Sequence, residues 1–294
     1  MAANGRAPRA AIVILSSFVL VASGACRSEE SVRAATPWAL IEPDATSAAR
    51  VEAADTSPSA APIEAVAPSR PAASVELELV QGRAADIEPI AYEVLEPADA
   101  GPETPLVIAL HGMGDTPRGF TRFVAQLGLR ARVFIGRGPE PYLYGGRQWY
   151  DNEAEDAIKQ VRQRAKDLTQ LASHVERLHP GAGKPALVGF SQGAAVVLQA
   201  ALEFPDRWRA VAGLSGFIAS EAGATRPTAS YPVLVTAGTE DEIVPAVRSW
   251  SAAGALVRYG HQDVRKLEFE GPHKVPKEVV AAVKKLFENV FATQ

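Results

Sequence analysis

Gly189-Phe190-Ser191-Gln192-Gly193 is the stretch that decides the fold of this chain. A short apolar run at residues 185–188 precedes it and is typical of a buried strand. A mostly apolar run at residues 194–202 follows it and predicts a helix. A bare G-x-S-x-G pentapeptide occurs often by chance, but a serine between a strand and a helix is typical of a nucleophile elbow. The two glycines fit that turn, because a side chain at either flanking position would collide with the neighbouring chain.

The rest of residues 74–294 alternates between strand and helix patterns. Strands are predicted near residues 75–79, 90–95, 106–110, 133–135, 210–216, 231–237 and 264–270. Helices are predicted from Pro117, over residues 153–178, after Pro245 and from Pro276. This alternation indicates an α/β fold with a mostly parallel central sheet and helices on both faces. Residues 217–230 are too few for a large cap domain between two of these strands.

The N-terminal residues 1–26 have the pattern of a targeting segment. Arg6 and Arg9 precede an apolar stretch, residues 10–22, that is short for a transmembrane helix. Cys26, the only cysteine, follows three small residues, as in a bacterial lipoprotein signal, although Ser23 stands where such signals usually carry Leu. We therefore expect an exported, cell-envelope protein anchored to a membrane through a lipid on Cys26. An ordinary secretory peptide, giving a periplasmic or secreted protein, is the alternative.

Composition narrows the function classes. Residues 27–73 are rich in Ala, Pro, Ser and Thr without a sustained apolar period, which predicts a disordered tether. The net charge of −4 without a basic stripe argues against nucleic acid as a partner. One cysteine permits neither an internal disulfide nor a thiolate cluster, and the five histidines are too scattered for a zinc site. No metal or organic cofactor is implied.

A serine nucleophile needs a base within hydrogen-bond reach, and the base needs an orienting carboxylate. In the fold class that uses such an elbow, these partners follow the serine in the order acid, then histidine. Asp241 and His273 satisfy that order, each in a loop after a predicted strand, where ligands of open α/β sheets bind. The alternatives are Glu240 or Glu242 as the acid and His261 as the base, although His261 precedes a strand.

Two other features bear on the site. The oxyanion hole of this fold uses the N–H of the residue after the nucleophile and one from the loop after an earlier strand, which indicates Gln192 and Met113. His174 falls on the polar face of its predicted helix and His179 ends that helix, so neither is a catalytic candidate.

The chain resembles the phospholipase/carboxylesterase family of α/β hydrolases, which includes acyl-protein thioesterases. The matching stretches are Leu110-His111-Gly112-Met113-Gly114-Asp115, Gly146-Arg147-Gln148-Trp149-Tyr150-Asp151, the elbow, residues 238–245 and Gly271-Pro272-His273. The family usually has Gly-Gly-His at the last of these, and many relatives have a histidine where Ala237 stands. The resemblance implies that Trp149 lies near an acyl-binding groove; the alternative is that Trp149 only packs the loop.

These observations predict a serine carboxylesterase that acts through Ser191, Asp241 and His273 by way of an acyl-enzyme. Its partner would be a small-molecule or acyl ester in a fairly open site. Acyl thioesters or lysophospholipids are alternative substrates for the same residues. A degenerate hydrolase domain that serves as a binding lipoprotein is the alternative from another class. The oligomeric state is not specified by the sequence.

Overall fold

Five consecutive apolar residues form the strand β3 (Leu106–Leu110), and all five are buried. A strand that is apolar on both faces belongs in the middle of a sheet covered by helices on both sides. The computed structural model describes residues 77–79 and 89–293. The expected signal segment, the tether and Cys26 lie outside the described residues.

The main sheet has eight strands in the order β1-β2-β4-β3-β7-β8-β9-β10 within the described part of the chain. The strands other than β3 are β1 (Leu77–Leu79), β2 (Tyr92–Pro97), β4 (Arg132–Gly136), β7 (Ala186–Phe190), β8 (Val211–Leu214), β9 (Pro232–Gly238) and β10 (Asp263–Phe269). β1 pairs antiparallel with β2, and β2 pairs antiparallel with β4. All the pairings from β4 to β10 are parallel, so the prediction of a mostly parallel sheet is confirmed.

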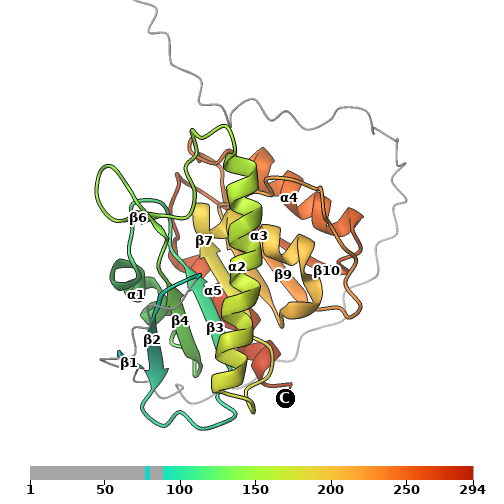
Figure 1. Ribbon diagram of the computed structural model, residues 1–294. Coiled ribbons are helices and arrows are strands. Elements are labelled where there is room, and N and C mark those ends of the chain that lie inside the picture. Colours follow the sequence, from blue (N-terminus) through green and yellow to red (C-terminus); the bar gives the residue numbers. More distant parts are fainter. Residues whose placement is uncertain (1–76, 80–88, 294) are drawn as a thin grey trace, which may run out of the picture. The chain divides into compact units, whose positions relative to one another are not determined.

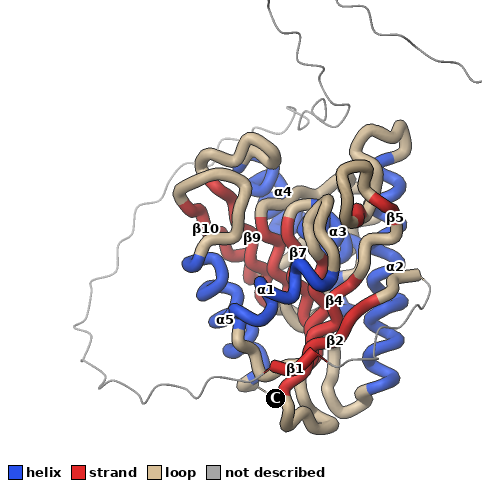
Figure 2. Tube along the Cα trace, turned by 90° about the vertical axis from the view of Figure 1, so that its left-hand side faces the viewer, coloured by secondary structure: helices blue, strands red, loops and turns tan. Residues whose placement is uncertain are grey.

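Helices cover both faces of this sheet (Figure 1). They are α1 (Pro117–Leu127), α2 (Ala157–Leu178), α3 (Gln192–Glu203), the short 3₁₀ helix η2 (Pro205–Arg207), α4 (Ala246–Arg258) and α5 (Lys277–Phe291). The apolar faces of α2, α3 and α4 share one core cluster, whereas those of α1 and α5 share the other. Figure 2 shows the sheet between these two layers. The α/β-hydrolase architecture is therefore confirmed, with helices on both faces.

Local sequence explains where α1 begins and ends. The side chain of Thr116 accepts a hydrogen bond from the Gly119 N–H and caps the helix, and Pro117 occupies its first position. Gly128 ends the helix in the left-handed region, with φ of 53°. The predicted apolar face is buried at Phe120, Val124 and Leu127.

Two local predictions were wrong. The first turn of α2 was placed at Glu153, but the helix begins at Ala157, because the Asp151 side chain accepts the Glu153 N–H in a turn. Ile158, which apolar spacings of three and four residues predicted to lie on the buried face of this helix, is exposed. His174 was placed on a solvated face, but its Nε2 lies 3.1 Å from the Tyr92 hydroxyl.

The segment between β4 and α2 was predicted as a loop and contains a two-stranded sheet. Its strands are β5 (Glu140–Pro141) and β6 (Arg147–Gln148). Gly145 and Gly146 make the turn at positive φ, which explains the glycine pair. The segment at residues 215–231, by contrast, holds no helix. Within residues 77–79 and 89–293, no helix combines the length and the apolar character needed to cross a membrane.

Candidate active site

Ser191 occupies a strained turn between β7 and α3. Its backbone has φ of 55° and ψ of −118°, a conformation that non-glycine residues rarely adopt. A Cβ on Gly189 would lie 2.3 Å from the Gly193 carbonyl oxygen, and a Cβ on Gly193 would lie 2.3 Å from the Leu110 carbonyl oxygen. The structure therefore bears out the predicted reason for the two glycines. The turn also lifts Ser191 to the carboxyl edge of the sheet, where its N–H donates to Leu214.

The structure brings Asp241 and His273 together at the same edge. His273 Nδ1 lies 2.7 Å from Asp241 Oδ2, and the carboxylate side chain is fully buried. The other oxygen, Oδ1, accepts the Ile243 and Val244 N–H groups at 3.0 and 2.8 Å. Because a carboxylate can only accept, His273 donates from Nδ1, which leaves its Nε2 as the basic nitrogen.

Backbone hydrogen bonds join the loop after β9, which carries Asp241, to the loop after β10, which carries His273. Thr239 N–H donates to Phe269 and Glu240 N–H donates to Gly271, both at 3.0 Å. The loops approach so closely that a Cβ on Gly238 would lie 2.5 Å from the Gly271 carbonyl oxygen. This packing fixes the distance between the Asp241 carboxylate and the His273 imidazole, because neither loop can shift without breaking these backbone hydrogen bonds.

The imidazole of His273 also lies beside the elbow. Its ring centroid is 4.8 Å from that of Phe190, the residue before Ser191. His273 Nε2 is buried and has no hydrogen-bond partner among the described residues. Catalytic hydrogen bonds are often long in unliganded enzymes and tighten when substrate binds. A buried, unpartnered basic nitrogen next to an elbow serine is the arrangement that a general base requires.

The structure separates the alternative acids and base from this pair. Glu240 and Glu242 are exposed, whereas Asp241 points inward to His273. His261 precedes β10 and so belongs to the amino edge of the parallel strands, opposite His273. There it packs edge-on against Tyr231, and burial lowers the pKa of its imidazole below the ordinary value.

Gln192 contributes a side chain that the sequence argument did not use. Its Oε1 accepts the Trp149 N–H at 2.9 Å, and its Nε2 donates to the Tyr150 carbonyl at 3.0 Å and to Asn152 Oδ1 at 3.1 Å. Through these hydrogen bonds, Gln192 fixes residues 149–152, which precede α2, against the first turn of α3. The sequence signal was a polar residue at the first position of a mostly apolar helix.

Trp149 is 1% exposed, so its indole offers almost no surface to a ligand. The indole N–H donates to the His111 carbonyl at 2.8 Å, and the ring packs against the His111 imidazole. The geometry thus favours the alternative in which Trp149 packs the loop. Asn152, nearby, donates to the Met113 sulfur at 3.5 Å.

His111 is a buried residue of the site that was quoted only as part of a motif. Its Nδ1 lies 2.7 Å from the Gly112 carbonyl, and its Nε2 lies 3.1 Å from the Gly138 backbone nitrogen. The Gly112 carbonyl can only accept, so Nδ1 carries a proton and donates it. The Gly138 backbone N–H can only donate, so Nε2 accepts and the imidazole is neutral. Burial lowers its pKa accordingly. His111 is thus a fixed link between the loop after β3 and the chain after β4.

Two backbone N–H groups remain available beside the serine. Gln192 begins α3, and the first N–H groups of a helix have no acceptor within it. In the loop after β3, the Gly114 and Asp115 N–H groups donate to Arg147 and Gly112, whereas no described acceptor takes the Met113 N–H. Among the described residues, no group of three or more His, Cys, Asp or Glu side chains could hold a metal ion.

A strained serine after a middle strand, with a buried acid–histidine pair after two later strands, places the protein in the class of α/β hydrolases. The comparisons with known proteins identify its family within that class. The model of the phospholipase/carboxylesterase family matches residues 91–290. The chain belongs to this family, as its motifs predicted.

A relative of known sequence agrees with this membership, and two solved structures share the fold. Acyl-protein thioesterase 1 of Schizosaccharomyces pombe is 30% identical over 209 residues, which cover 65% of this chain and 92% of the relative. The Bacillus cereus carboxylesterase shares the fold with a TM-score of 0.61 at 15% identity, covering 69% of this chain and 95% of the other. Zea mays acyl-protein thioesterase 2 gives a TM-score of 0.55 at 22% identity, with coverages of 68% and 98%.

Proposed function

We propose that the protein is a serine hydrolase that cleaves carboxylic esters through Ser191, His273 and Asp241. The observation that carries the proposal is the 2.7 Å contact between His273 Nδ1 and the buried Asp241 carboxylate. This contact leaves His273 Nε2 as a base beside a serine on a strained elbow. Family membership supports ester hydrolysis as the activity.

The mechanism is acyl transfer in two steps. His273 Nε2 takes the Ser191 hydroxyl proton as the serine oxygen bonds to the ester carbonyl carbon, and Asp241 stabilises the resulting imidazolium. The tetrahedral intermediate collapses, the bond to the alcohol oxygen breaks, and His273 gives that oxygen its proton. Water, deprotonated by His273, then attacks the acyl-enzyme, which releases the acid and regenerates Ser191.

The backbone N–H groups of Met113 and Gln192 would hold the oxyanion. Donors placed where negative charge develops contribute strongly to catalysis, and loss of one costs about 10²–10³ in kcat. The contacts of His111, Trp149 and Gln192 support this role, because they fix both loops that carry the donors. The donors would therefore be preorganised by three buried side chains.

Acyl thioesters are the second candidate substrate, favoured by the thioesterase name of the S. pombe relative. The same serine, base and oxyanion donors serve both ester types, since each reaction passes through a tetrahedral oxyanion. Lysophospholipids remain a third option. The lack of a helix between β8 and β9 supports an open site, in which soluble esters or small acylated surfaces fit.

Fluorophosphonate labelling tests the proposal. Wild-type protein should label and hydrolyse 4-nitrophenyl esters, and Ser191→Ala should do neither while folding normally. Ser251→Ala, at an exposed serine of α4, is the matched control and should label like wild type. Wild-type protein that is not labelled and does not hydrolyse the esters would overturn the proposal that the protein is an enzyme. That outcome would favour the alternative of a binding lipoprotein.

We also propose export and lipid anchoring at Cys26, a residue that lies outside the described part of the chain. The support is the sole cysteine at the end of a signal-like segment. Metabolic labelling with a fatty-acid probe should mark the wild-type chain and leave Cys26→Ala unmarked. Equal marking of both would contradict the anchor and favour an ordinary secretory peptide.

A further inference from the structure

Met113 lies in the loop after β3, and this loop packs directly on the elbow. A Cβ built on the neighbouring Gly112 would lie 3.1 Å from a ring carbon of Phe190 and 3.4 Å from Ser191 Cβ. The backbone N–H of Met113 is one of the two proposed oxyanion donors. The Met113 side chain is 37% exposed, so small solutes can reach its thioether close to the proposed nucleophile.

Sulfur is rare in this chain. The sequence holds two methionines, Met1 and Met113, and one cysteine, Cys26. Met1 and Cys26 lie outside the described residues, so Met113 is the sulfur-bearing residue of the described part of the chain. Oxidants convert a methionine thioether, which is apolar, into a polar sulfoxide. The described part of the chain therefore offers an oxidant one sulfur atom, and that sulfur belongs to the candidate active site.

The Met113 sulfur takes part in the contacts that hold the proposed oxyanion donors. Asn152 Nδ2 donates to Met113 Sδ at 3.5 Å. Asn152 Oδ1 accepts from the Gln192 side-chain Nε2 at 3.1 Å. Gln192 supplies the second proposed donor through its backbone N–H, so Asn152 links the side chains of the two donor residues. A change in how strongly the sulfur position accepts a hydrogen bond therefore acts on both residues.

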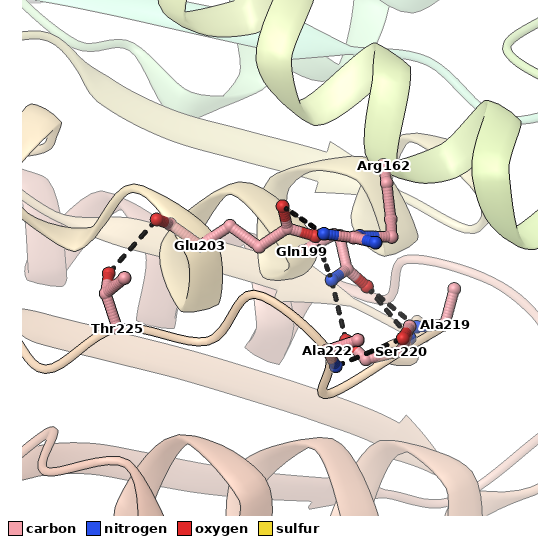
Figure 3. A network of polar contacts seen from close by, with 7 residues as sticks. All are labelled: Arg162, Gln199, Glu203, Ala219, Ser220, Ala222 and Thr225. Carbon is pink, nitrogen blue, oxygen red and sulfur yellow. Dashed lines mark hydrogen bonds and ion pairs between the residues drawn. The ribbon is translucent and has the colours of Figure 1, made fainter.

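The helix α3, which begins at Gln192, is fastened at its other end. Gln199 Oε1 accepts two backbone N–H groups of the chain after β8, and Glu203 accepts from Gln199 and from Arg162 of α2 (Figure 3). A shift of α3 would break these hydrogen bonds. A new group on the Met113 side chain must therefore be accommodated by the loop after β3.

We propose that Met113 is an oxidation site at which a peroxide reversibly lowers the proposed esterase activity. A lone pair of the sulfur attacks one oxygen of hydrogen peroxide, the O–O bond breaks, and hydroxide leaves with the electron pair of that bond. The new S–OH group then gives its proton to the hydroxide. The products are methionine sulfoxide and water, so the sulfur loses two electrons and the peroxide gains them.

The sulfoxide alters the site in two ways. A thioether is a weak acceptor, whereas the sulfoxide oxygen is polar and accepts strongly. It draws the Asn152 amide toward itself, which displaces the Asn152 oxygen that accepts from Gln192. The partial negative charge of the sulfoxide oxygen also opposes the negative charge that the oxyanion develops beside the same loop. Both effects weaken the stabilisation of the transition state, so kcat falls.

The inference rests on the proposed ester hydrolysis, which supplies its readout. The full chain is treated with hydrogen peroxide and sampled over time. Mass spectrometry follows the addition of one oxygen atom to the Met113 peptide, and hydrolysis of 4-nitrophenyl acetate gives kcat. In wild type, kcat should fall at least about fivefold in step with sulfoxide formation, a part of the factor of about 10²–10³ that complete loss of one oxyanion donor costs.

Reduction of the sulfoxide should restore kcat. Methionine sulfoxide reductases for both sulfoxide epimers are added with dithiothreitol. The two thiols of dithiothreitol form a disulfide and supply two electrons, the S–O bond breaks, and the oxygen leaves as water. Urea unfolding of the oxidised protein should give the midpoint of the untreated protein, because the side chain that changes is exposed. The recovery of kcat thus distinguishes oxidation of Met113 from general damage.

Two variants separate Met113 from other oxidisable groups, each compared with its own activity before treatment. Met113→Leu carries no thioether at this position, so peroxide should leave unchanged whatever activity this variant has. Cys26→Ala removes the cysteine and should lose activity to the same extent as wild type. The time course and the recovery in wild type test the inference independently of both variants.

The outcomes separate this inference from the function beneath it. Wild-type protein that hydrolyses the ester and keeps its kcat in peroxide, with or without sulfoxide at Met113, would overturn the inference and leave the esterase proposal standing. An equal fractional loss in Met113→Leu and in wild type would do the same and assign the loss to another residue. Wild-type protein that hydrolyses no ester before treatment would overturn both proposals.

Discussion

The Nδ1 of His273 lies 2.7 Å from Oδ2 of Asp241, although 32 residues of chain separate the two. β9 and β10 are neighbours in parallel register, so the loops that follow them start at the same edge of the sheet. Two backbone hydrogen bonds then join these loops. The pair is thus held by two neighbouring strands and by the hydrogen bonds between the loops that follow them.

Asp241→Asn should lower kcat for an ester substrate by about 10³–10⁴, because an amide cannot stabilise the imidazolium and favours the wrong tautomer. Steady-state hydrolysis of a 4-nitrophenyl ester measures this effect. Glu240→Gln and Glu242→Gln are matched controls on exposed neighbours and should retain most activity. A comparable loss in either control, with Asp241→Asn active, would assign the acid to another residue.

Gly193→Ala should destabilise the fold by at least about 3 kcal/mol, because its Cβ would lie 2.3 Å from a backbone oxygen that cannot move aside. Gly254→Ala is the opposite case within α4, where the added Cβ would meet Arg258 at an ordinary 3.5 Å. There alanine should stabilise the helix by about 0.5–1 kcal/mol. Urea unfolding of both variants measures the contrast, and similar effects of the two substitutions would contradict it.

Gln192→Ala should affect both stability and rate. The buried Trp149 N–H and Tyr150 carbonyl lose their partner, which costs about 1–3 kcal/mol for each unsatisfied group. The loop beside the proposed oxyanion donors should loosen as well, so kcat should fall at a temperature where the variant is still fully folded. Gln170→Ala, at an exposed glutamine of α2, provides the control. A variant that loses stability and keeps kcat would limit Gln192 to a packing role.

Acid should weaken the fold through two buried histidines. Burial lowers the pKa of His111 and of His261 below the ordinary 6.5. The unfolded chain therefore binds these protons at higher pH than the folded chain does. The resulting stability is fully present above pH 6.5 and is lost as pH falls through that value toward the folded pKa values.

The slope from each histidine is at most about 1.4 kcal/mol per pH unit. Urea unfolding between about pH 7.5 and 5.5 measures it, because carboxylates titrate mostly below that window. His261→Gln should reduce the slope, since one of the two groups no longer titrates. Equal slopes for wild type and variant would show that His261 is not kept neutral by the fold.

Much of the fold follows from local patterns. Apolar runs and their spacing located each of the longer strands and helices to within a few residues, because strand and helix periods are properties of short segments. The short β5–β6 pair escaped prediction, since its strands are two residues each and depend on the bridge between Asp115 and Arg147. The start of α2 was missed because a side-chain turn at Asp151 competes with the helix.

The sequence by itself determined the chain order of Ser191, Asp241 and His273, which are the proposed nucleophile, acid and base, together with the elbow glycines and the family. These depend on spacing along the chain and on the strand or helix beside each motif. Tertiary structure alone decided which of three consecutive acidic residues faces His273, that Trp149 is buried, and that Gln192 clamps a distant loop. It also decided that Asn152 donates to the Met113 sulfur. Such contacts join residues tens of positions apart, and the order of strands in the sheet sets which of them meet.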